Sequence, residues 1–230
     1  ELFNERRMRT GGLTAYVPFD GTAQDIAGSN AVVLGGAPVY VKTQGGFYKG
    51  LSCGTLETNI SDNASISNVL GSKVGTIALW YYARGPWYNY QTIFDNPINQ
   101  DYWECWIAAD GRLAARVSNK TGGGDIRYSL DNLRGPNNWY HVAFVWDLGM
   151  GQIQLYVDGV RRVIGTLTDG GWIDPDPTLN LAGGHKGNSK GNGIWDEMRV
   201  YDRALTDAEI AALTVVPPAP PPGGTVFTLR

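Results

Sequence analysis

Two loops carry aromatic side chains that could contact a ligand. The segment ARGPWYNYQ contains Trp87, Tyr88 and Tyr90, and Trp172 stands in a second loop beside aspartate and proline residues. Flat aromatic rings offer a large contact area at low entropic cost and can take the apolar face of a sugar ring. Loop aromatics also dominate protein interfaces, or they can fold back over the edge of the domain. We therefore predict these four residues as ligand contacts, with glycan, protein and no ligand as the three interpretations.

The residues that would perform hydrolysis are missing from the sequence. Cleavage of a glycosidic bond needs two carboxyl groups on either side of it, and no Glu-x-Asp-x-x-Glu or similar set occurs. Asp196 and Glu197 are adjacent in a predicted strand, so simple alternation sends their side chains to opposite faces. No metal-protease, nucleophile-elbow or phosphate-loop motif is present. His141 lies in an apolar strand pattern typical of a hydrogen-bonded core histidine. The sequence predicts a protein that is not an enzyme.

The segment from Trp139 to Val163 indicates how these loops are supported. Apolar residues alternate over 139–146 and again over 152–157, and Asp158-Gly159 between the last two strands is a type I′ turn signal. Further strands are predicted at 13–19, 31–34, 39–41, 76–83, 92–95, 102–108, 112–117, 126–130, 179–182 and 194–201. Many short strands joined by glycine-rich turns predict an all-β fold, a two-sheet antiparallel β-sandwich (jelly roll).

One short C-terminal helix follows the strands. Thr206 and Glu209 have the spacing of a capping box, and the helix is expected to end near Leu213. Residues 1–12 are interpreted as an N-terminal arm, 13–213 as the domain, and 214–224 as a stiff proline-rich spacer. Residues 225–230 have the composition of a strand without a partner strand. We expect residues 1–12 and 217–230 to mediate a homo- or hetero-oligomeric assembly.

The overall composition excludes some classes of partner. The chain of 230 residues has a net charge of −3, which argues against a general nucleic-acid binder. No apolar run is long enough for a membrane span, and no secretory leader is evident. Cys53 and Cys105 fit either one disulfide or two small buried hydrophobes.

Five motifs in order resemble the laminin-G-like, concanavalin A-like jelly-roll family. They are YVPFDG from Tyr16, GTIALW from Gly75, WYHVA from Trp139, LYVDG from Leu155 and WDEMRVYDRAL from Trp195. The resemblance covers about residues 13–213 and implies two curved antiparallel sheets packed face to face. It also implies a structural Ca²⁺ near the first loop and the last strand, with Asp20, Asp25, Asn30 and Asp196 as the matching residues.

The leading hypothesis is a non-catalytic, lectin-like surface module. It would bind glycan or protein ligands and be displayed in a larger extracellular assembly, at a cell surface or on a virion. An alternative is a structural subunit of a virion (a capsid decoration or tail protein) or of a surface filament, with the termini mediating assembly. A glycoside hydrolase or lyase is disfavoured because paired carboxyl groups are lacking.

Overall fold

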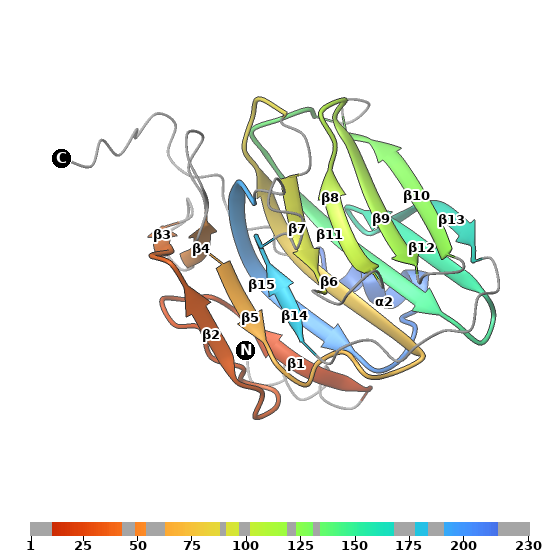
Figure 1. Ribbon diagram of the computed structural model, residues 1–230, viewed down its shortest axis with the longest axis horizontal. Coiled ribbons are helices and arrows are strands. Elements are labelled where there is room, and N and C mark those ends of the chain that lie inside the picture. The colour runs from red at the N-terminus through yellow and green to blue at the C-terminus, as the bar shows by residue number, and fades with distance from the viewer. Residues whose placement is uncertain are drawn as a thin grey trace.

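The strands form two antiparallel sheets packed face to face. The computed structural model describes residues 11–42, 49–53, 63–87, 91–96, 102–118, 123–130, 134–167, 178–183 and 191–215. In Figure 1 the sheet containing β7–β10 lies in front of the sheet containing β6, β11 and β15, and the helix α2 lies behind both. The predicted all-β sandwich with one short helix is confirmed.

The rear sheet has eight strands within the described residues. They are β1 (Leu13–Val17), β3 (Val39–Lys42), β4 (Lys49–Cys53), β6 (Val74–Ala83), β11 (Asn138–Asp147), β12 (Gln152–Val157), β13 (Val160–Thr166) and β15 (Gly193–Tyr201). Their order is β13-β12-β11-β6-β15-β4-β3, and β1 pairs with the second half of β15. Asp158 and Gly159 both have positive φ, 53° and 75°, as the predicted turn between β12 and β13 requires.

In the part of the chain that the structure describes, the front sheet has seven strands. They are β2 (Val32–Gly35), β5 (Asn63–Ile66), β7 (Gln91–Asp95), β8 (Tyr102–Ile107), β9 (Arg112–Ser118), β10 (Gly123–Ser129) and β14 (Leu179–Leu181), in the order β10-β9-β8-β7-β14-β5-β2. The sequence did not predict β4 or β5, and β10 begins at Gly123, three residues before the strand predicted at 126–130. These strands are short or contain glycine. They form because they pair with a neighbouring strand, and their own sequence pattern does not indicate a strand.

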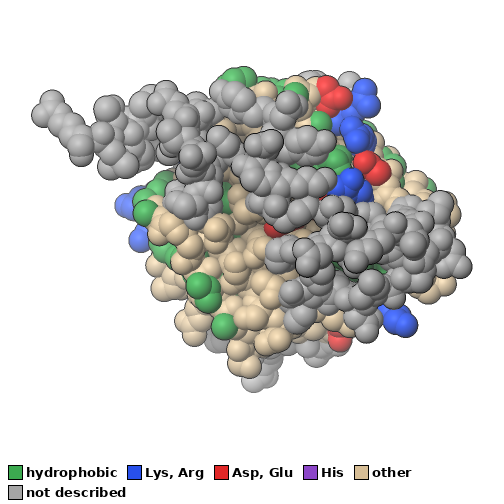
Figure 2. All heavy atoms as spheres, viewed as in Figure 1, with side chains coloured by type: hydrophobic (Ala, Val, Ile, Leu, Met, Phe, Trp, Pro, Cys, Tyr) green, Lys and Arg blue, Asp and Glu red, His purple; other side chains and the backbone are tan. Residues whose placement is uncertain are grey.

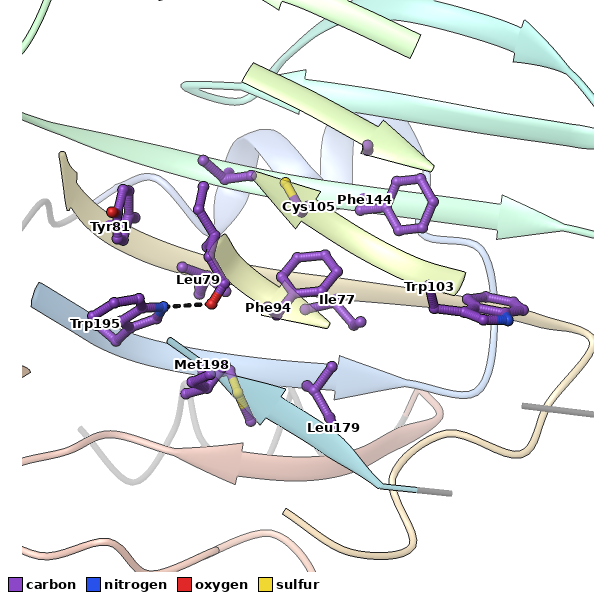
Figure 3. Close-up of a cluster of buried hydrophobic side chains, with 14 of the residues drawn as sticks. Ile77, Leu79, Tyr81, Phe94, Trp103, Cys105, Phe144, Leu179, Trp195 and Met198 are labelled. Atoms are coloured by element: carbon purple, nitrogen blue, oxygen red, sulfur yellow. Dashed lines mark hydrogen bonds between the residues drawn. The ribbon is translucent and has the colours of Figure 1, made fainter. Parts of the chain in front are cut away.

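Aromatic rings from both sheets fill the space between them (Figure 3). Trp195 lies edge-on to Tyr81, with ring centroids 5.0 Å apart, and Trp103 lies edge-on to Trp146 at 4.8 Å. The Trp195 indole also donates a hydrogen bond of 2.8 Å to the carbonyl oxygen of Ile93 on the opposite sheet. The core therefore buries large apolar surfaces and satisfies the polar edge of that indole.

Both cysteines belong to this core. Cys53 and Cys105 are buried thiols on β4 and β8. Burial raises the pKa of the Cys105 thiol above its ordinary value. Of the two interpretations of this pair, the structure supports the small buried hydrophobes.

A β-bulge interrupts β15 and changes where its acids point. The side chains of Trp195, Met198 and Val200 all enter the core, and the pairing of β15 with β6 shifts register between Asp196 and Arg199. Glu197 has a φ of 54° at this point. The bulge adds one residue between Trp195 and Met198, whose side chains both enter the core. The side chains of Asp196 and Glu197 therefore share the outer face. The prediction of opposite faces was wrong because the sequence does not reveal the bulge.

The helix α2 (Asp207–Ala212) packs on the outer face of the rear sheet. Ile210 and Leu205 are buried against Tyr156 and Tyr201. The predicted capping box is confirmed: the Thr206 hydroxyl accepts from the Glu209 amide, and the Glu209 carboxylate accepts from the Thr206 amide. No helix within the described residues is long and apolar enough to cross a membrane.

We predict that the stability gained from this cap depends on the ionised form of Glu209. Hydrogen bonds from Arg203 and then from Thr206 lower the pKa of Glu209 to about 2. Because this pKa lies below that of the unfolded chain, the contribution is present above pH ~4.3 and is lost as the pH falls toward 2. Thermal unfolding should show Glu209→Gln destabilised at pH 7 and level with wild type near pH 2, and Thr206→Ala should cost about 1 kcal/mol.

The matched control for this prediction is Asp110→Asn. Asp110 forms an exposed ion pair with Arg112 at a turn, and both side chains are about half exposed. Exposed pairs of this kind contribute little. A Glu209→Gln variant whose melting temperature equals that of the control at pH 7 would contradict the prediction.

Candidate functional site

Several strands meet at one end of the sandwich, which we call the loop end. β6 stops at Ala83 and β4 at Cys53, and both pair with Gly193, the first residue of β15. β7 also begins at this end, which lies at the top of Figure 1. The chain that leaves β6 passes through Trp87, which is half-buried and packs against the core. Of the predicted ligand contacts, Tyr88, Tyr90 and Trp172 lie outside the described residues.

A group of polar side chains lies beside Trp87. The Arg84 guanidinium donates to the Ser52 hydroxyl at 2.6 Å, and burial lowers the Arg84 pKa. The Gln91 amide nitrogen donates to the carbonyl oxygens of Arg84 and Pro86, at 3.3 and 3.1 Å. Gln91 therefore ties the start of the loop that carries Trp87 to the first residue of β7.

Tyr81 and Asn192 extend this group toward β15. The buried Tyr81 hydroxyl donates to the carbonyl oxygen of Asn192 at 2.9 Å. A Cβ atom on Gly193 would lie 2.2 Å from the Tyr81 ring, and one on Gly191 would lie 2.3 Å from the Cα atom of Ala182. Asn192 is therefore held between two positions that accept only glycine. The sequence analysis missed Gln91 and Asn192, because neither stands in a motif and only the fold brings them to the loop end.

Asp196 is a strongly perturbed carboxyl group on the rear sheet. It is fully buried, and neither of its oxygens accepts a hydrogen bond with acceptable geometry. Burial, followed by the charges of Glu197 and Asp20, raises its pKa to about 9, and the nearby Glu197 amide offsets only part of the rise. Gly50 on β4 lies beside Asp196, and a Cβ atom there would be 3.8 Å from that of Asp196. The bulge thus places a protonated acid in a space without a polar partner.

The neighbours of Asp196 are charged and paired. Glu197 accepts hydrogen bonds from the Tyr16 hydroxyl at 2.7 Å and from Arg199 at 2.5 Å, and the Arg199 guanidinium stacks on the Tyr16 ring. Asp20 accepts a hydrogen bond from the Lys49 amide at 3.0 Å. Asp20, Glu197 and Asp196 are thus near enough for their charges to interact, and two of the three have polar partners.

Asp25 and Asn30 form a separate turn beside β1. One Asp25 oxygen accepts from the amides of Tyr16, Ala27 and Gly28 at 2.9–3.1 Å. The other accepts from the backbone and side-chain amides of Asn30 at 3.3 and 2.6 Å. The Asp25 carboxylate is therefore fully engaged in holding the turn, as expected for an aspartate that organises a loop backbone.

The four residues matched to a calcium site thus fall into two pairs. Asp20 and Asp196 are electrostatically coupled, whereas Asp25 and Asn30 bind each other and the turn. Across the described ranges, no three His, Cys, Asp or Glu side chains gather with the spacing of metal ligands. Of these four residues, only Asp196 has buried oxygens without hydrogen-bond partners, which a hard cation would neutralise.

A row of charged side chains crosses the outer face of the front sheet. The strand register places Asp95, Glu104, Arg116 and Asp125 opposite one another across β7–β10. Arg116 forms an ion pair with Glu104, and Arg127 binds Asp125 at 3.1 Å. Figure 2 shows these two signs of charge side by side over β8–β10. The sequence analysis missed this row because its members come from four strands.

Two of these acids, Asp95 and Glu104, face each other directly across β7 and β8. Their residues are only 1% and 8% exposed, and the Glu104 carboxylate is bound by Arg116. A glycosidase needs a carboxyl pair that a substrate can reach. This arrangement instead pairs charges within the sheet.

His141 is buried, as predicted, and only 1% exposed. Its ring packs against that of Trp80, with centroids 5.4 Å apart, but its Nδ1 atom has no hydrogen-bond partner, unlike the hydrogen-bonded core histidine that the sequence predicted. Burial, together with the positive charge of Arg199, lowers its pKa to about 3, so the ring is neutral at physiological pH. A neutral, enclosed imidazole packs and does not exchange protons with a ligand.

Solved structures with the same fold come from botulinum neurotoxins. The receptor-binding domain of the C/D mosaic serotype superposes with a TM-score of 0.70 at 15% identity over 88% of this chain, and the serotype D binding domain with 0.71 at 14% over 88%. The binding domain of neurotoxin DC, solved in complex with rat synaptotagmin II, gives 0.70 at 16% over 88%. The chain spans about half the length of these domains, 50–51%. At these identities the likeness concerns the fold alone.

A comparison with curated proteins found no significant match. A family model described as the concanavalin A-like lectin/glucanases superfamily (laminin G type 3) matches residues 58–211. This match covers more than half of the chain and includes four of the five motifs that carry the resemblance. The chain belongs to the laminin-G-like branch of the concanavalin A-like lectin and glucanase superfamily.

Proposed function

We propose that this protein is a non-catalytic, lectin-like recognition module that binds glycan or protein ligands at its loop end. The observation that carries the proposal is the collection of Trp87, Arg84, Gln91 and Asn192 at that end. An aromatic ring beside hydrogen-bonding groups is the usual composition of a ligand site. In keeping with its family, we place the module outside the cell, displayed in a larger assembly.

The hydrogen bonding and burial of the acidic side chains favour recognition over catalysis. Within the described part of the chain, Glu104, Asp125 and Glu197 are bound by arginines, and Asp25 is bound by amides. Asp196 has the raised pKa of a general acid but is completely enclosed. A general acid must lie within hydrogen-bond reach of the substrate.

The fold is compatible with either class of ligand. The neurotoxin DC binding domain, which shares the fold, was solved bound to synaptotagmin II, a protein. The family description includes lectins, which bind sugars. Trp and Arg serve both purposes, because they dominate protein interfaces and also contact sugar rings.

We predict that ligand binding depends on Trp87 at the loop end and on Trp172, the predicted ligand contact of the second loop. Glycan-array and receptor-capture assays on the full chain should give a signal that falls at least about tenfold in Trp87→Ala and in Trp172→Ala. Thermal unfolding must accompany the binding assay, because Trp87 also packs against the core.

Tyr128→Ala is the matched control. Tyr128 is likewise a half-buried aromatic packed against the core, but it lies on the edge strand β10 beneath Arg162. It should lose stability and keep binding. Equal binding by all three variants and wild type, or no binding by wild type to any glycan or protein, would refute the proposed function.

We also propose a structural Ca²⁺ held by Asp20 and Asp196, with Glu197 beside them. A divalent cation would stabilise the ionised form of the buried Asp196, whose oxygens otherwise lack partners. Asp25 and Asn30 are left out, because amides already occupy the Asp25 carboxylate.

Removal of calcium should therefore lower the melting temperature, and its return should restore it. A ligand at 100 times its Kd stabilises a protein by about 2.7 kcal/mol. In Asp196→Asn the shift caused by the chelator should disappear. A wild-type protein that melts at the same temperature with chelator and with millimolar calcium would remove the ion from the proposal.

Asp25→Asn should behave differently from Asp196→Asn. Burial alone would raise the Asp25 pKa, but hydrogen bonds from Tyr16, Gly28 and Ala27 outweigh it and lower the pKa below its ordinary value. The contribution of Asp25 is therefore present at neutral pH and lost below about pH 4. Asp25→Asn should cost about 1–3 kcal/mol at pH 7 and keep the full chelator shift. Loss of that shift would place Asp25 among the calcium ligands.

A further inference from the structure

The front sheet ends in an uncovered strand, β2. This strand lies at the left edge of the sheet in Figure 1 and, among the described strands, pairs with β5 alone. Val33 is 61% exposed and Leu34 is 36% exposed, and the chain carries no charged residue from Ile26 to Val41. Natural proteins protect a free edge with charge, proline or a covering segment, because its unpaired backbone groups pair readily with another strand. An apolar, uncharged edge is therefore a candidate surface for strand addition.

The other terminal strands of the two sheets carry such protection. β13 contains Arg161 and Arg162, and the Arg162 guanidinium lies over the Tyr128 ring of β10 at 5.2 Å. The edges of β13 and β10 thus lie against each other and close that side of the sandwich. β3 follows Pro38 directly and ends at the exposed Lys42. Of the four strands that end the sheets in the described part of the chain, β2 is the one without this protection.

The backbone of β2 presents hydrogen-bonding groups to the free edge. The Ser67 amide donates to the carbonyl oxygen of Ala31 at 3.1 Å. Bonded and non-bonded pairs alternate along an antiparallel ladder. Val33 therefore bonds to β5 as Ala31 does, whereas Val32 and Leu34 turn their N–H and C=O groups away from β5. These outward groups have no hydrogen-bond partner among the described residues, and a β-strand is the partner that offers donors and acceptors at the matching spacing.

A second copy of β2 fits this pattern. With a two-fold axis through Val33, Val32 of one copy lies opposite Leu34 of the other, and each such pair exchanges two hydrogen bonds. Every outward group of both strands is then satisfied. The two Val33 side chains face each other in the closely spaced pair between, where Cα atoms are about 4.5 Å apart and β-branched side chains pack well. No like charges meet, because the segment has none, and a charged partner strand would find no complementary charge there.

We propose that β2 is a self-pairing edge through which two copies of this chain join their front sheets. The contact is small, since one pair of short strands buries less than the roughly 1,200–2,000 Å² of a stable interface. The dimer is therefore weak in dilute solution and forms where copies are held at high local concentration. The inference goes beyond the proposed function, because it names the partner and the contact by which the modules assemble and it requires no ligand.

Cysteine cross-linking tests the register of this pairing. In Val33→Cys the two thiols would face each other at a Cα separation that a disulfide accepts. Mild oxidation of the full chain should then give a covalent dimer on a non-reducing gel. The natural thiols of Cys53 and Cys105 do not interfere, because both are buried.

Two matched variants place the same thiol elsewhere. Leu34→Cys lies on the same strand but would face a different residue of the second copy, and Ile164→Cys lies on β13, where the natural side chain is 55% exposed. Both should cross-link at least about tenfold more slowly than Val33→Cys. Equal cross-linking by the three variants, or none in Val33→Cys at millimolar protein, overturns the inference.

Sedimentation velocity over a concentration series tests the same contact without a covalent bond. Wild-type protein should show a weak dimer. Val33→Lys and Val33→Glu should each remain monomeric, because like charges would lie opposite each other, and an equal mixture of the two should dimerise again. Ile164→Lys is the matched control, because it adds a charge at a similarly exposed position on β13, and it should associate as wild type does.

Thermal unfolding of each variant checks that it folds, which the exposure of Val33 favours. Association that survives Val33→Lys and disappears when residues 225–230 are removed assigns the assembly to the C-terminal tail and overturns the inference. A wild-type monomer at every concentration also overturns it. Neither result affects the proposed function, whose variants at the loop end are measured by ligand binding.

Discussion

The whole molecule depends on the burial of two apolar sheet faces against each other. Tyr81, Trp146 and Trp195 on the rear sheet interlock with Trp103 and residues of β7 on the front sheet. Such packing removes a large apolar area from water, at about 25 cal/mol per Å², and this is the main favourable term in folding. Because the inner faces pack against each other, only the outer faces, the free strand edges and the loops at the ends of the strands are available to contact other molecules.

The outer faces are occupied as well. On the rear sheet, α2 covers Tyr156 and Tyr201, and the corner around Glu197 is held by Arg199 and Tyr16. On the front sheet, the ion pair of Arg116 with Glu104 lies over Trp106. Charges paired within the sheet keep the outer faces polar at little net cost or gain. Buried polar atoms without partners remain at several places, among them the Gln91 oxygen and the Asn192 side chain at the loop end and the Asp196 carboxyl group on the rear sheet. A polar group buried without a partner costs free energy that a bound group could recover.

The bulge in β15 is the one local irregularity that changes the chemistry of the rear sheet. Without it, regular alternation would turn Glu197 toward the core, where an unpaired carboxylate is costly to bury. With it, the acids Asp196 and Glu197 share a face, and the charge of one raises the pKa of the other. Bulges often redirect side chains near functional sites. Here the bulge provides the unsatisfied carboxyl group on which the calcium proposal rests.

Local sequence patterns determined the strands from β11 to β13, the turn at Asp158-Gly159 and the cap of α2, because each depends on neighbours within a few residues. The sandwich followed from many such strands, and the family from motifs in order. Tertiary structure alone decided the bulge at Asp196, the charged row led by Glu104, and the position of Gln91 and Asn192 at the same end of the sandwich. These features join residues about 10 to 100 positions apart, and pairing register and packing set such distances. The order of residues along the chain does not show which strand edges will become neighbours.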